Sequence, residues 1–490
     1  MTVSSDGHEA QQAAPVDSIV ALLRALVAIP SRGDGPSHGA STAHTGATSA
    51  REWRDADTAS DDFEPVLACV ETWFTRHGIA SHRLLSHDEG TPVGLVAQIE
   101  GSAPTQGERP WYVLNATLDT AGFGDLQSWT HPPLGATVVD GWLVGRGAGD
   151  SKAGAALFAH LLAAFATRRD TFAGTLTVLF DVDEHSGRFG GARTFFDRDA
   201  PVVAVPGRTG APRPDGVMIG YPGIDRVMVG ARGFLRARLT VRGIAAHSGG
   251  SSSRGLSALL RGAAIAQTLA ALPLECPMPD AESNGMAGSG VSGECANFNG
   301  ATISTAAPGS AIPTISTHTT DPTPFDKPAQ LTLTAITAGN GGFTQVPDRC
   351  ELALDLRLTP HVTADVARQA VETAIREHDL AYPPTLPTTI DWLPGWPAYR
   401  VPDTHPMLAA LDRAARNEWH APLPHAVAGP SNIGNYLAAL DVPALCGFGV
   451  RAEGIHAAGE RIELASIGSV YRIYEAALHT LLGAPREPRP

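Results

Sequence analysis

The sequence predicts an α/β protein: a mixed, largely parallel sheet flanked by helices, with a smaller two-layer α+β unit inserted into it. Between residues 94 and 181, short apolar segments alternate with helical segments, as they do when a largely parallel sheet is covered on both faces. Between residues 227 and 398 the order becomes strand, helix, strand, strand, helix, strand, which is typical of a compact two-layer unit. A chain of 490 residues also exceeds one simple core, so more than one domain is expected.

The elements of the larger domain follow from apolar spacing and from Pro and Gly boundaries. We expect a disordered N-terminus over 1–16 and the first part of this domain over 17–226. Its elements are helices near 17–30, 63–77 and 151–168 and strands at 94–100, 111–118 and 174–181. A polar, Gly-rich loop is expected over 31–62. The second part, 399–490, is predicted to hold helices at 405–418, 432–440 and 466–482 and a strand at 444–448.

The inserted domain is expected over 227–398. One long half-exposed strand is predicted over 226–242, because apolar and basic residues alternate near its end. The further expected elements are a helix at 255–272, a long loop at 280–327, strands at 330–338 and 349–358, a helix at 363–377 and a last strand at 388–392.

Composition restricts the class of partner. The formal charge of −14 disfavours binding to nucleic acid or to an anionic membrane surface. The N-terminal segment has no basic-then-apolar signal, and no apolar run is long enough to span a bilayer, so we expect a cytoplasmic protein. The five cysteines are scattered without a CxxC pair, which argues against both a disulfide framework and a cysteine zinc cluster.

Four short segments carry the residues suited to chemistry, and each follows a strand, where α/β sheets present their working groups. They are LNATLD (114–119), GRGAGDSKAG (145–154), DVDEHSG (181–187) and GIHAAGE (454–460). Taken singly, Asp150 could cap a helix, Glu184 and His185 could end a strand, and His456 could be structural. Together, two histidines, an aspartate and a spare glutamate are the components of a catalytic zinc site: three ligands, an open position for water, and a base.

These segments, with VRGIAAHSGG and QVPDRCELALDLRLTP, resemble a family of zinc peptidases and deacylases. That family contains aminoacylases, acetylornithine deacetylase, succinyl-diaminopimelate desuccinylase and glutamate carboxypeptidase. The resemblance covers most of the chain in the family's order, including the inserted domain. It implies a hydrolase that cleaves an amide bond of a small peptide or an N-acyl amino acid, and a homodimer formed through the inserted domain.

The resemblance also implies specific ligands and specific losses. Family members hold two metal ions, and the match makes Asp150 the bridging ligand, Glu184 the general base and His456 the C-terminal ligand. Thr117 stands where the family has a histidine, and Tyr221 where it has a carboxylate before a proline, so the first metal loses both of its own ligands.

At the second metal, His185 stands at the position of a glutamate ligand. We therefore predict one divalent metal held by Asp150, His185 and His456, a donor set that suits Zn²⁺ first and also Mn²⁺ or Fe²⁺. Thr117 and Tyr221 are expected to line a substrate pocket where the first metal is lost.

Three more residues have two explanations each. Asp119 matches the carboxylate that orients the missing histidine in catalysis, or is a buried acceptor near Lys152 or backbone amides. His247 matches a family histidine that polarises the scissile carbonyl across a dimer, or is a strand-end histidine bonded to Ser248.

Arg357 could grip a substrate carboxylate, or pair with Asp348 or Asp355. Asn432 stands where many relatives have Asp and is expected near the substrate. Two alternatives to hydrolysis remain open: a metal-free binding or partner homologue, and an unusual C–N reaction such as amide transfer or formation.

Overall fold

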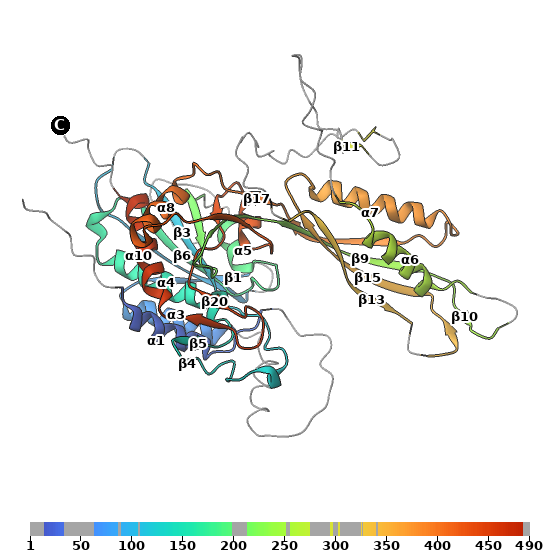
Figure 1. Ribbon diagram of the computed structural model, residues 1–490, viewed down its shortest axis with the longest axis horizontal. Coiled ribbons are helices and arrows are strands. Elements are labelled where there is room, and N and C mark those ends of the chain that lie inside the picture. Colours follow the sequence, from blue (N-terminus) through green and yellow to red (C-terminus); the bar gives the residue numbers. More distant parts are fainter. Residues whose placement is uncertain are drawn as a thin grey trace, which may run out of the picture. The chain divides into compact units, whose positions relative to one another are not determined.

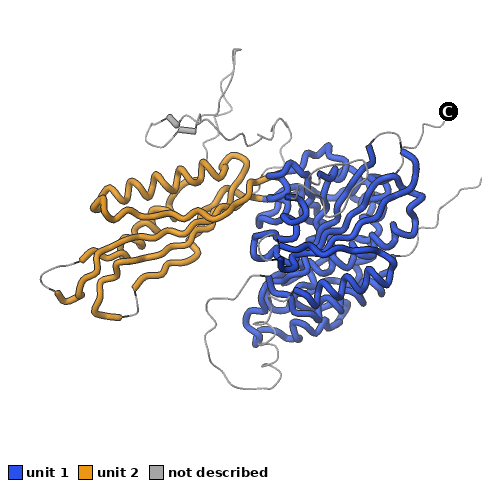
Figure 2. The backbone as a smooth tube through the Cα atoms, turned by 180° about the vertical axis from the view of Figure 1, so that it is seen from behind, with its two compact units in different colours: residues 1–231, 400–490 blue, residues 232–399 orange. Residues whose placement is uncertain are grey.

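The computed structural model describes residues 14–33, 63–86, 90–105, 108–197, 213–250, 255–274, 295–296, 302–303, 325, 327–339 and 342–483. Most of the two predicted long loops, 31–62 and 280–327, lies outside these residues, as does nearly all of the predicted disordered N-terminus. The chain forms two compact units, one of residues 1–231 with 400–490 and one of residues 232–399 (Figure 2).

A mixed six-stranded sheet is the centre of the first unit. Its strand order is β1-β2-β6-β3-β7-β19. The first two pairs are antiparallel, whereas β6, β3, β7 and β19 run parallel, so the fold class predicted from the sequence is confirmed. The strands are β1 (Ser81–Leu85), β2 (Pro92–Glu100), β3 (Trp111–Thr117), β6 (Thr175–Asp181), β7 (Gly216–Ile219) and β19 (Ala444–Leu445).

Helices surround this sheet (Figure 1). They are α1 (Val16–Val27), α3 (Glu64–Arg76), α4 (Ala153–Ala166), α5 (Gly190–Phe196), α8 (Pro406–Trp419), α9 (Ile433–Ala439) and α10 (Ser466–Leu482). Every residue of β3 and β6 is buried, which explains their continuous apolar runs. The alanine-rich α4 packs against α1, α10 and the strands next to it. Within the described residues, no helix has both the length and the apolar content to cross a membrane.

Two smaller sheets of the first unit position the loops that matter for function. One has the order β17-β8-β18 and the other the order β20-β21-β5-β4. Their strands are β4 (Thr137–Val139), β5 (Trp142–Val144), β8 (Val227–Ala231), β17 (Tyr399–Arg400), β18 (His425–Ala428), β20 (Ala452–Glu453) and β21 (Arg461–Glu463). Because β5 pairs antiparallel with β21, the segment after Val144 and the segment before Arg461 lie side by side.

The second unit is a four-stranded antiparallel sheet with the order β13-β15-β9-β16. Its main elements are β9 (Gly233–Arg242), α6 (Ala258–Ala270), β13 (Gln330–Ala338), β15 (Arg349–Leu358), α7 (Ala364–Asp379) and β16 (Thr389–Trp396). Alternate residues of β9 and β15 are buried and form one apolar core with residues of both helices. Short strands form two further pairs: β10 (Ala246–His247) with β14 (Gln345–Val346), and β11 (Cys295–Ala296) with β12 (Thr302–Ile303).

The single long strand predicted over 226–242 is wrong in one respect, because the structure has two strands with Arg232 between them. The cause is a change of pairing partner: β8 pairs in parallel with β18 of the first unit, whereas β9 pairs antiparallel with β15 of the second. The second unit accordingly begins at residue 232 and ends at 399, where the sequence suggested 227 and 398.

Candidate metal centre

Three of the residues singled out in the sequence, Asp150, His185 and His456, lie together in the first unit. Each offers one ligand atom, and these atoms all lie within 4.8 Å of one another. Oδ2 of Asp150 is 3.1 Å from Nε2 of His456 and 3.8 Å from Nε2 of His185. The three come from three separate segments: the turn after β5, the loop after β6, and the turn between β20 and β21.

Two buried polar atoms of this group have no hydrogen-bond partner. They are Nε2 of His185 and Oδ1 of Asp150. Leaving a buried polar atom unsatisfied costs about 1–3 kcal/mol, which a coordinated cation would offset. The side chain of His456 is 53% exposed, so the group has an open side. Two imidazoles and a carboxylate with an open side are a chemically sound set for a divalent transition metal.

Asp119 fixes the orientation of His185. Its Oδ2 accepts the backbone N–H of His185 at 2.9 Å and lies 3.2 Å from Nδ1 of the same residue. A carboxylate at Nδ1 keeps the proton on that nitrogen and leaves Nε2 free as a ligand atom. Asp119 has features of both explanations: it is a buried acceptor of a backbone amide, and its carboxylate faces Nδ1 of His185 where the sequence suggested a different histidine. Lys152 instead donates to the backbone oxygens of Leu26 and Ile29.

Negative charge predominates around Asp150, His185 and His456, as the raised pKa of His185 indicates. Burial alone would lower the pKa of His185, but the negative charges of Asp119 and the other nearby carboxylates raise it to about 10. Burial would raise the pKa of Asp150, yet the hydrogen bond from His456 and the charges of both histidines hold it below its usual value. Carboxylates therefore dominate the potential here, and protons or a metal ion balance them.

Glu184 lies beside this group and is bonded to Tyr221. The Tyr221 hydroxyl donates to Oε1 of Glu184 at 2.6 Å. Burial raises the pKa of Glu184 to about 7. Burial and the charge of Glu184 raise the pKa of Tyr221 well above its usual value, so this phenol keeps its proton.

Thr117 lies in the protein interior. It is fully buried, and its hydroxyl is 3.2 Å from Oγ of Ser151, which also accepts the Thr117 backbone N–H at 2.9 Å. Neither Thr117 nor Tyr221 offers an anionic oxygen to a metal.

Sequence reasoning missed a buried ion pair that joins two of the ligand-bearing segments. Nη1 of Arg146 lies 2.7 Å from Oε2 of Glu460, and each side chain is 1% exposed. Oε1 of Glu460 accepts the backbone N–H groups of Gly149 and Asp150, at 2.9 and 3.1 Å. Both charged residues stand inside the GRGAGD and GIHAAGE segments, which is the signal that could have found them.

The remaining predicted residues have other contacts. Asn432 caps α9, since its Oδ1 accepts the Gly434 N–H at 2.8 Å. His247 belongs to the second unit, is exposed, and accepts the Gly249 N–H at Nδ1, 3.1 Å away, in place of the predicted bond to Ser248.

Arg357 also belongs to the second unit. It pairs with Asp355, Nε to Oδ2, at 2.8 Å, which is one of the two partners expected on the structural explanation.

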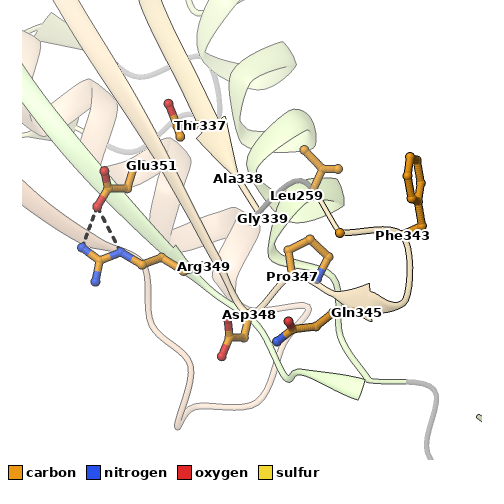
Figure 3. A pocket seen from close by; sticks show the side chains of 11 residues that line it. Leu259, Thr337, Ala338, Gly339, Phe343, Gln345, Pro347, Asp348, Arg349 and Glu351 are labelled. Carbon is orange, nitrogen blue, oxygen red and sulfur yellow. Dashed lines mark hydrogen bonds and ion pairs between the residues drawn. The ribbon is translucent and has the colours of Figure 1, made fainter. Parts of the chain in front are cut away.

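The second unit also has a hollow of about 590 Å³, lined by residues of α6, β13, β14 and β15 (Figure 3). Two of its charged residues, Arg349 and Glu351, are bonded to each other at 2.6 Å. It contains none of the candidate ligands, and we do not assign it to the reaction.

The sequence of this chain is similar to those of known enzymes and of one peptidase family. Residues 113–480 match peptidase family M20/M25/M40. A succinyl-diaminopimelate desuccinylase from Alkalilimnicola ehrlichii is 26% identical over 383 residues, which are 76% of this chain and 84% of that protein. One from Rhodospirillum centenum is 31% identical over 122 residues, 24% of this chain and 30% of that protein. This chain thus matches about a third of the length of several of these relatives.

Solved structures share the fold at low sequence identity. An M20 family metallo-carboxypeptidase from Sulfolobus solfataricus has a TM-score of 0.62 at 13% identity, covering 95% of this chain and 99% of its own. Human carnosine dipeptidase 1 has a TM-score of 0.61 at 16% identity, covering 95% and 96%. A dinuclear metal-binding M20 peptidase from Bacillus subtilis has a TM-score of 0.58 at 14% identity, covering 95% and 98%. The family resemblance predicted from the sequence is confirmed: this chain belongs to peptidase family M20/M25/M40.

Proposed function

We propose that this protein is a metal-dependent hydrolase that cleaves an amide bond of an N-acyl amino acid or a small peptide. The observation that carries the proposal is the group of Asp150, His185 and His456, whose ligand atoms all lie within 4.8 Å of one another, with Glu184 next to it. Nε2 of His185 and Oδ1 of Asp150 are buried without a hydrogen-bond partner. The names of the curated relatives, succinyl-diaminopimelate desuccinylases, support an acylated amine as the substrate class.

We infer a single metal, Zn²⁺ in the first place, at these three residues. A second ion would need ligands where this chain has a buried threonine bonded to Ser151 and a protonated phenol bonded to Glu184. Neither group is a good zinc ligand. The dinuclear peptidase from Bacillus subtilis is only 14% identical, so its metal count is not carried over to this chain.

In the proposed reaction, a divalent cation bound at this site supplies Lewis-acid chemistry, lowering the pKa of water and polarising a carbonyl. Glu184 accepts the proton of the attacking water and later donates it to the leaving amine. Its pKa of about 7, raised by burial, suits both steps near neutral pH. Asp119 keeps His185 in one orientation, and Asp150 is held through the backbone contacts of Glu460. Oxyanion stabilisation by His247 stays a prediction.

We also propose a homodimer formed through the second unit. β13 is an edge strand there, and an open edge can pair with another chain. Ile336 on this strand is 50% exposed and Leu260 on α6 is 71% exposed, which is apolar area that a partner would cover. Replacing Ile336 by Asp should shift the protein towards the monomer in analytical ultracentrifugation. Two outcomes would contradict this part of the proposal: a wild-type protein that is wholly monomeric, or a variant whose monomer fraction equals that of the wild type. The predicted cytoplasmic location stays a prediction.

The decisive test combines metal content with a substrate screen. The purified protein, loaded with zinc, would be assayed against N-acetyl and N-succinyl amino acids and dipeptides, with release of the free amine as the readout. We expect hydrolysis of at least one class, lost on chelation and restored by metal. A protein that binds no stoichiometric metal and releases no amine would support the metal-free binding homologue. Amide formation or transfer from the same substrates would support the unusual C–N reaction.

A further inference from the structure

Tyr221 occupies one oxygen of the proposed base, Glu184. It follows β7 in the turn IGYPG, where the family resemblance implies a carboxylate for the first metal. Its hydroxyl donates to Oε1 of Glu184 at 2.6 Å. We propose that Tyr221 is a positioning residue that holds Glu184 in place as general base. This inference rests on the proposed hydrolytic function.

The loop that carries Tyr221 is held by backbone hydrogen bonds on both sides of the residue. Before it, the Gly220 N–H donates to the Asn115 oxygen at 2.8 Å. The Gly223 N–H donates to the Val450 oxygen at 3.1 Å, and the Gly449 N–H donates to the Gly223 oxygen at 2.9 Å. A Cβ on Gly449 would lie 2.4 Å from the carbonyl oxygen of Tyr221, so the neighbouring loop approaches as closely as glycine allows. The phenol is therefore held in its bonding position before substrate binds, and such pre-organisation is what a positioning residue requires.

The bond leaves the second oxygen of Glu184 for catalysis. Oε2 lies 3.5 Å from Nδ1 of His185, whose proton is directed to Asp119. In the proposed step, Oε2 takes one proton from water as the C–O bond forms. It returns that proton to the nitrogen as the C–N bond breaks, so the carboxylate ends unchanged. Tyr221 donates to Oε1 throughout and keeps its own proton, since burial and the charge of Glu184 raise its pKa.

This arrangement explains why a tyrosine can stand at a ligand position of a lost metal. A protonated phenol is a poor metal ligand, but it is a good donor to a carboxylate. The position has thus changed from holding a cation to holding the base. Our sequence-based expectation, that Tyr221 lines an enlarged substrate pocket, assigned it a different role.

The test is Tyr221→Phe in the full-length, zinc-loaded protein, assayed on the N-acyl amino acid or dipeptide that the wild type hydrolyses fastest. Loss of one hydrogen bond to a charged group should lower kcat about 10- to 100-fold. KM and metal content should stay as in the wild type. The matched control is Tyr436→Phe, which removes a 2.5 Å hydrogen bond from Tyr436 to Asp197 elsewhere in the same unit. This control should keep wild-type kcat.

A double substitution separates positioning from a general structural role. If Tyr221 acts through Glu184, then Tyr221→Phe should have no further effect on the residual activity of Glu184→Gln. Multiplicative losses in the double variant, or a normal kcat in Tyr221→Phe while Glu184→Gln is inactive, would overturn the inference and leave the proposed function standing. A wild-type protein that hydrolyses none of the substrates would overturn both.

Discussion

Arg146 and Glu460, 314 positions apart in the sequence, form an ion pair in which both side chains are 1% exposed. Glu460 accepts the backbone N–H of Asp150, and Arg146 donates to the backbone oxygen of His456 at 3.1 Å. One pair thus ties the segment of one candidate ligand to the segment of another. Buried pairs contribute little net stability, so a role in fixing geometry is a better explanation than a stabilising one.

We predict that Glu460→Gln lowers metal affinity about 10- to 100-fold, as is typical when groups that orient metal ligands are changed. The glutamine cannot neutralise Arg146, so the free energy of unfolding should fall as well. The matched control is Asp379→Asn, which breaks the pair between Asp379 and the buried Arg261 in the second unit, 2.7 Å apart. Both variants should lose stability in denaturant titrations. An equal metal affinity for both variants and the wild type would mean that the Arg146–Glu460 pair is only structural.

The second prediction concerns stoichiometry. Elemental analysis of the wild-type protein should give close to one tightly bound metal per chain. Replacing Thr117 by His and Tyr221 by Asp together should raise this number towards two, because the first site regains two ligands beside Asp150. Asp119 can help, since its Oδ1 is buried and has no hydrogen-bond partner. Two tightly bound metals in the unaltered chain would rule out the single-metal proposal.

A third prediction isolates the base. Glu184→Gln keeps the size of the side chain and can still accept the Tyr221 hydrogen bond, but it cannot take a proton. Hydrolysis should fall about 10²- to 10⁴-fold, with metal content unchanged. Steady-state kinetics and elemental analysis on the same preparation check this. Activity that survives the change would mean that another group accepts the proton.

The elements with strong local patterns could be predicted from the sequence. β13 and β15 have the predicted bounds, because alternating apolar residues mark a strand with one face against the core; that face is buried in β15 and half-buried in part of β13. The helix predicted from Ser151 begins at Ala153 instead, since Asp150 and Ser151 have non-helical backbone angles. The spacing of apolar residues along the sequence contains no information on such local departures from helical geometry.

The candidate site was predictable in its members but not in its connections. From residue types and motif order, Asp150, His185 and His456 were predicted as ligands of one metal. The bond of Tyr221 to Glu184 and the use of Asp119 by His185 were not predicted, because each joins segments tens of residues apart through one side-chain contact. Pairings of this kind depend on which strands are neighbours in the sheet, and β3 lies between β6 and β7 only in the folded chain.

The last prediction concerns His185 and pH. In the metal-free protein its pKa is about 10, since the nearby carboxylates outweigh the opposing effect of burial. This value exceeds the unfolded pKa of about 6.5, so the bound proton stabilises the metal-free fold fully below about pH 6.5. That contribution is lost as the pH rises through about 10. A metal at Nε2 has to displace the proton, so metal affinity should rise with pH, by up to about tenfold per unit for this group.

Substitutions at His185 separate this effect from other titrating groups. His185→Ala should lose most of the metal affinity, because two ligands hold zinc poorly. His185→Glu should keep a metal, more weakly, since its carboxylate would face Asp119 without a proton donor between them. It should also lose much of the pH dependence, because a carboxylate needs no proton displaced near neutral pH. Competition titrations against a chelator, between about pH 6 and pH 9, measure all three proteins. Indistinguishable affinities, or a wild-type affinity that does not change with pH, would mean that His185 only ends its strand and binds no metal.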